Sequence, residues 1–91
     1  MSSFAVPPRL AFVVPDDVDA PQVFLMPLPD GPPVALEGIS AAIWVLAADG
    51  EEDVVGAVGA LVGKMPSEVG DAVEKYLQEL VFRGLLTTRS D

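Results

Sequence analysis

The sequence contains no histidine and no cysteine, so the side chains that could do chemistry are mainly carboxylates and hydroxyls, including that of a single tyrosine. Zinc sites, thiol nucleophiles and the commonest general base are therefore excluded. Two groups of carboxylates are dense enough to consider: the run Asp49-Gly-Glu-Glu-Asp53 and the cluster Asp16, Asp17 and Asp19. The serines have no histidine beside them that could activate their hydroxyls.

Neither carboxylate group has the pattern of a known site. The run from 49 to 53 lacks the ligand spacing of an EF-hand loop and its terminal bidentate glutamate, so we interpret it as a helix end followed by an acidic first turn. The cluster from 16 to 19 has no apolar pocket beside it that would separate an acid from a base, so we interpret it as a solvated loop. The sequence predicts no catalytic residue, no metal site and no cofactor, and we expect that the protein is not an enzyme.

The formal net charge of −9 restricts the partners further. Nucleic acids and anionic membranes are bound through lysine and arginine, of which this chain has only five, so we expect neither as a partner. The apolar runs are far too short for a membrane span, and the N-terminus lacks the basic region of a signal peptide. The sequence therefore predicts a single domain over residues 1–91, located in the cytoplasm, with neutral or basic protein partners.

The N-terminal third is predicted to be extended, because eight of the nine prolines precede Val34. Short β-branched and aromatic runs that end at prolines predict strands at about 9–14, 22–26 and 33–36. Pro33 opens the third run, and a proline cannot donate a ladder hydrogen bond, so we expect this strand at an edge. We expect residues 1–8 and 87–91 to fray, which leaves an ordered core of about 8–86.

The remainder is predicted to be helical, at about 38–48, 52–62 and 67–83. Gly63 and Gly84 are placed to end the last two helices, since glycine adopts the left-handed cap conformation without strain. Trp44 is interpreted as a core residue. The fold class is therefore α+β: a three-stranded antiparallel sheet followed by three helices (β-β-β-α-α-α), similar to a winged helix-turn-helix.

On the last helix, two side chains could bind a partner. Tyr76 belongs to the apolar stripe that includes Val73 and Leu80, but its hydroxyl favours the rim of that stripe, so structural and binding roles are both open. Arg83 lies on the same flank and is interpreted either as a solvated residue or as a partner for a carboxylate.

Five segments in this order resemble the PqqD family, the peptide-recognition elements of pathways that modify ribosomally made peptides. They are Pro8-Arg9-Leu10, Val34-Ala-Leu36, Ser40-Ala-Ala-Ile-Trp44, Asp49-Gly50 and Val73-x-x-Tyr76-Leu77-x-x-Leu80-x-x-x-Gly84-Leu-Leu86. The resemblance covers nearly the whole chain from Pro8 to Leu86. Glu37, Ala72 and the pair Pro32-Pro33 depart from the usual pattern of the family.

The resemblance implies that a leader peptide adds as a strand along the third strand, with its side chains against the third helix. Carried onto this sequence, the peptide-binding residues are Val34, Ala35, Leu36, Val73, Tyr76, Leu80 and Arg83. The implied partners are a precursor peptide and a separate modifying enzyme, such as a radical maturase or a leader peptidase. The protein itself would be a monomer or a weak dimer.

Two alternatives from other classes stay open. A winged-helix DNA-binding regulator is compatible with the order of the elements but is opposed by the low lysine and arginine count. A non-catalytic protein–protein adaptor, pairing through its unprotected strand edge, is the other.

Overall fold

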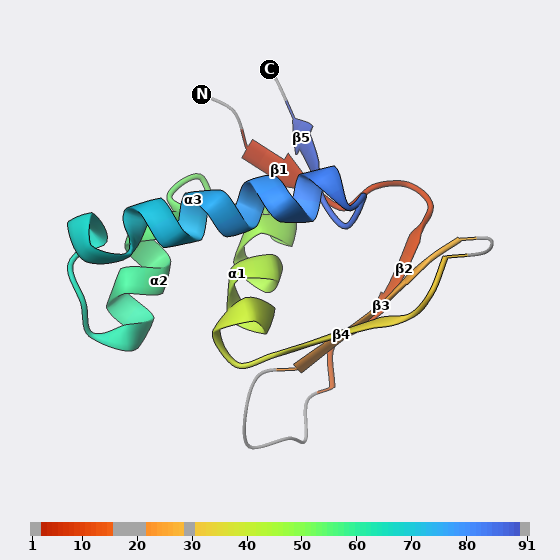
Figure 1. The fold of residues 1–91 in the computed structure, drawn as a ribbon, viewed down its shortest axis with the longest axis horizontal. Coiled ribbons are helices and arrows are strands. Elements are labelled where there is room, and N and C mark those ends of the chain that lie inside the picture. The colour runs from red at the N-terminus through yellow and green to blue at the C-terminus, as the bar shows by residue number, and fades with distance from the viewer. Residues whose placement is uncertain (1–2, 16–21, 29–30, 90–91) are drawn as a thin grey trace.

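The computed structural model describes residues 3–15, 22–28 and 31–89 (Figure 1). Its elements are, in chain order, β1 (Ser3–Ala5), β2 (Leu10–Val13), β3 (Gln22–Pro27), β4 (Val34–Glu37), α1 (Ile39–Ala48), α2 (Val54–Val62), α3 (Pro66–Phe82) and β5 (Thr87–Arg89). The α+β class is confirmed, since a three-stranded antiparallel sheet precedes three helices. The observed bounds of these six elements differ from the expected ones by at most two residues. The acidic cluster Asp16, Asp17 and Asp19 lies outside the described residues.

The three-stranded sheet has the order β2-β3-β4, with antiparallel pairing on both sides of β3. Val23 and Leu25 alternate with Phe24 and Met26 along β3, and the first pair is buried while the second is exposed. This period of two places one face of the sheet against the helices and leaves the other face open.

A short ribbon at the chain ends corrects the expectation of fraying. β1 and β5 pair antiparallel, with Phe4 opposite Thr88. The segments Ser3–Ala5 and Thr87–Arg89 therefore lie side by side, as Figure 1 shows beside α3. Neither three-residue segment carries a strand pattern of its own, so the ribbon depends on the fold that brings the ends together.

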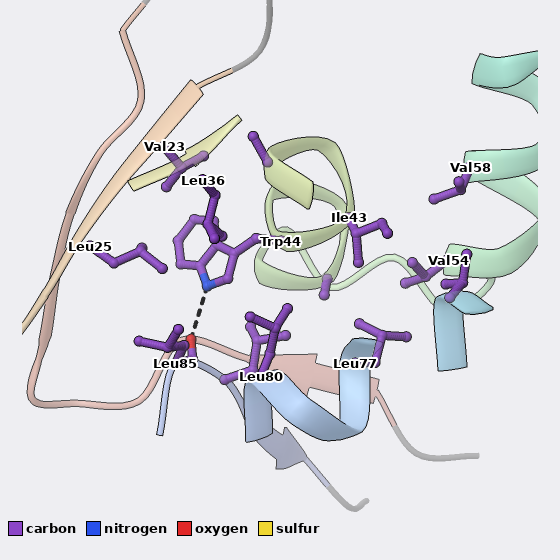
Figure 2. Close-up of a cluster of buried hydrophobic side chains, with 14 of the residues drawn as sticks. Val23, Leu25, Leu36, Ile43, Trp44, Val54, Val58, Leu77, Leu80 and Leu85 are labelled. Atoms are coloured by element: carbon purple, nitrogen blue, oxygen red, sulfur yellow. Dashed lines mark hydrogen bonds between the residues drawn. The ribbon is translucent and has the colours of Figure 1, made fainter. Parts of the chain in front are cut away.

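Trp44 is the centre of the core. Its indole is 1% exposed and lies between the sheet residues Val23, Leu25 and Leu36 and the residues Leu80 and Leu85 (Figure 2). The indole Nε1 donates a buried hydrogen bond of 2.9 Å to the carbonyl oxygen of Leu85. α1 therefore fastens the sheet to the end of α3, and the core role predicted for Trp44 is confirmed.

The order of the layers follows from the position of α1, which packs against β3 and β4 on one side and against α2 and α3 on others. Figure 1 shows α3 crossing both of the other helices. The buried side of α3 is formed by Val73, Leu77 and Leu80. Val69, Tyr76 and Val81 of the same helix are partly buried against this core.

Glycines end the helices as predicted. After α3, Gly84 has a φ of 77°, the Leu85 amide donates to the Leu80 carbonyl and the Gly84 amide donates to the Val81 carbonyl. This is a Schellman motif, and Gly63 with a φ of 70° ends α2 in the left-handed conformation. Gly59, inside α2, allows a close approach, since a Cβ there would lie 2.8 Å from the Lys64 carbonyl oxygen.

Candidate functional site

β4 is an outer strand of the sheet. It pairs with β3 on one side, and no strand of the described residues pairs with its other side. In an antiparallel ladder alternate residues direct their N–H and C=O groups to each side, so half of those of β4 point away from β3. Pro33, immediately before β4, has no N–H to donate. The edge position predicted for the third strand is confirmed, and any added strand would pair from Val34 onward.

The side chains of β4 divide between the two faces of the sheet. Leu36 is buried opposite Val23, and Val34 is half-buried against the core. Ala35 and Glu37 are exposed on the open face. A strand added here would meet only backbone groups at Leu36, because the Leu36 side chain is buried. The side chains of the added strand would lie alternately on the two faces of the sheet.

The four predicted site residues of α3 differ from one another in burial. Val73 and Leu80 belong to the core, at 3% and 0% exposure. Tyr76 is half-buried at the margin of the core, and Arg83 is exposed at the C-terminal cap of the helix. Of these four side chains, Tyr76 and Arg83 present surface to a partner.

An apolar hollow of about 180 Å³ lies between α1, α2 and the first half of α3. Its lining is apolar apart from Lys64: Ile39, Ile43, Val58, Val62, Val69, Ala72 and Val73. Ile39 is half exposed and follows β4 by two residues, so the hollow opens beside one end of that strand. Of the predicted site residues it includes Val73. Ile39, Val69 and Ala72 were not predicted as site residues, although the helical periodicity that places Val69 beside Val73 was a usable signal.

Helical geometry relates this hollow to the flank that carries Tyr76. With 3.6 residues per turn, Val69, Ala72, Tyr76 and Arg83 follow one another along one side of α3. Val69 and Ala72 line the hollow, so Tyr76 and Arg83 continue the same flank towards the end of the helix. The hollow and this flank together form a surface that is apolar at one end and carries a phenol and a guanidinium at the other.

The acidic run between α1 and α2 has a structural role at both of its ends. Asp49 is the C-terminal cap of α1, and Gly50 has a φ of 84°. The Asp53 carboxylate accepts a hydrogen bond of 3.1 Å from the Gly56 amide and caps the N-terminus of α2. Among residues 3–15, 22–28 and 31–89, no three acidic side chains are grouped so that they could hold a metal ion.

No helix in the described part of the chain combines the length and the apolar character that crossing a membrane requires. Comparison with protein-family models, with curated proteins and with solved structures finds no match to this chain.

Proposed function

We propose that this protein binds the leader segment of a ribosomally made precursor peptide as an extra strand on β4 and presents it to a separate modifying enzyme. The observation that carries the proposal is the open edge of β4 beside the apolar hollow. The protein would form no bond itself. Such a carrier would work in the cytoplasm, where precursor and enzyme are both made.

The edge supports this function through its backbone. An extended peptide that pairs with β4 would gain main-chain hydrogen bonds, which supply affinity independent of sequence. β2 is the other outer strand of the same sheet. β4 is favoured because it leads directly into α1, whose first residue Ile39 lines the hollow. A peptide on β4 would thus have side-chain pockets within reach.

The flank of α3 that carries Tyr76 supports the proposed function because its side chains would recognise the sequence of the peptide. Apolar side chains of the leader would contact Ile39, Val69 and Ala72, and Tyr76 would supply both an aromatic face and a hydroxyl at the margin. Arg83 is exposed one turn beyond Glu79 and would pair with a carboxylate of the peptide. Leu80 would then support this surface from beneath, while Val73, at 3% exposure, would form part of the floor of the hollow.

The surface of α3 opposes the DNA-binding alternative. In a helix-turn-helix the second helix enters the major groove, and that helix corresponds to α3. Its exposed residues include Glu68, Asp71, Glu74 and Glu79 against Lys75. Four carboxylates on this surface would repel the phosphates that a DNA-binding helix must approach.

We expect a short precursor peptide to be encoded beside this protein, and the experiment is a titration of the protein with the leader segment of that peptide. Tyr76→Ala should weaken binding by about tenfold or more, which corresponds to about 1.4 kcal/mol. Gln78→Ala is the matched control, because Gln78 is exposed and lies about 200° around the same helix. Equal affinity of Tyr76→Ala and the parent protein would contradict the assigned flank, and absence of any binding would contradict the function.

A further inference from the structure

A second and larger hollow lies on the other flank of α3. It has a volume of about 730 Å³ and is formed by the middle of α3, the start of α2 and strand β1. None of its lining residues belongs to the 180 Å³ hollow beside β4. α3 therefore separates two depressions, and a molecule bound in one would leave the other accessible. We call the larger one the α2–α3 groove.

The floor of the α2–α3 groove is apolar. Val54 and Leu77 are buried beneath it, while Phe4 and Val55 are half-buried and present apolar surface. Phe4 is held in place by the pairing of β1 with β5, where it lies opposite Thr88. The ribbon formed by the chain ends thus supplies one wall of the groove.

The rim of the groove has one predominant sign of charge. Glu52, Asp53, Asp71 and Glu74 line it, all exposed, against the single cation Lys75. Among the described residues, no three acidic side chains are grouped so that they could hold a metal ion. Distributed negative charge around an apolar floor matches an extended partner that carries several cations, better than it matches a single ion.

We infer that the α2–α3 groove docks a basic amphipathic segment of a protein partner. Its apolar side chains would cover Phe4 and Val55, and its lysines or arginines would pair with the carboxylates of the rim. Complementary charge of this kind accelerates association and favours the correct partner, and both effects decline as salt is added. The site is independent of the strand edge, so a partner docked here and a peptide bound at β4 could be held together, which raises their effective concentration.

The test uses a synthetic helical peptide with leucines every third or fourth position and lysines on its flanks, titrated into isotopically labelled full-length protein. We expect amide shifts at Phe4, Val55 and Gln78, and binding weakened at least tenfold by the double variant Asp71→Lys/Glu74→Lys. The control is Glu68→Lys/Glu79→Lys, which makes the same change of charge on the same helix outside the groove. It should weaken binding less than threefold.

Three outcomes would overturn the inference. The first is the absence of binding. The second is equal weakening by both double variants, which would show that the peptide is attracted by the net charge alone. The third is equal binding of a peptide with glutamates in place of the lysines. Tyr76→Ala should leave this titration unchanged, because Tyr76 does not line the groove. Failure here is therefore distinguishable from failure of the strand-addition proposal.

Discussion

The indole Nε1 of Trp44 donates a hydrogen bond of 2.9 Å to the carbonyl oxygen of Leu85, and both residues are 1% exposed. This bond joins the middle of α1 to the segment just after α3, 41 residues further along the chain. Because the Leu85 amide also ends α3 by donating to Leu80, one residue both closes the helix and anchors it to the core. The flank of α3 that we assign to binding is positioned by this connection.

Replacing Trp44 by phenylalanine should lower the free energy of unfolding by more than the loss of buried apolar area alone would. The Leu85 carbonyl would remain buried without a donor, which costs about 1–3 kcal/mol, and the smaller ring would leave a cavity. Urea unfolding followed by circular dichroism measures the change. A loss of less than about 0.5 kcal/mol would show that the hydrogen bond does not hold α1 to the end of α3.

Phe12 and Phe24 provide a matched pair, since both are 48% exposed and they lie on neighbouring strands. Phe12 packs on Trp44, with ring centroids 5.1 Å apart and an angle of 58° between the planes, whereas Phe24 is on the open face. Phe12→Ala should therefore cost about 0.5–1.5 kcal/mol more than Phe24→Ala. Equal losses in denaturant unfolding would contradict the assignment of Phe12 to the inner face.

Two glycines of the α3 region should respond to alanine in opposite directions. Gly84 has a φ of 77°, so Gly84→Ala should destabilise by about 1–2 kcal/mol although nothing obstructs the added Cβ. Gly70 lies inside α3, and its added Cβ would meet Val55 Cγ1 at 3.6 Å, an ordinary contact. Gly70→Ala should stabilise by about 0.5–1 kcal/mol. Melting temperatures of the two variants provide the comparison, and changes of the same sign would contradict this account.

Much of the fold follows from local patterns, which explains where sequence reasoning succeeded. Prolines and short β-branched or aromatic runs located the three strands of the sheet, and glycines located the helix ends, because each acts on the backbone of its own neighbourhood. In contrast, α2 begins at Val54, two residues after the expected start, because Asp53 caps its N-terminus. The β1–β5 ribbon could not be found in this way, since each strand is three residues long and is stabilised by a partner more than 80 positions distant.

The sequence predicted where the candidate site lies, but not which of its side chains are exposed. Pro33 before Val34 indicated an edge strand, and the periodicity of α3 indicated its apolar stripe. The stripe alone could not show that Leu80 is fully covered while Tyr76 is not, because the covering residues, Trp44 and Leu85, come from other parts of the chain. The same limit applies to Ile39 and Val69, whose shared hollow exists only after α1 and α3 have packed.

The most direct test of the central proposal is a backbone methylation scan of the leader peptide. Single N-methyl groups, placed along the segment that pairs with β4, remove one amide donor at a time without changing the protein. Strand addition on β4 predicts that affinity falls at least tenfold at every second position and stays near the parent value between them, since alternate amides face the edge. The amides of Val34–Glu37 that face away from β3 should exchange more slowly in the complex. Affinity that is insensitive to methylation, or that falls equally at consecutive positions, would contradict binding as an added strand.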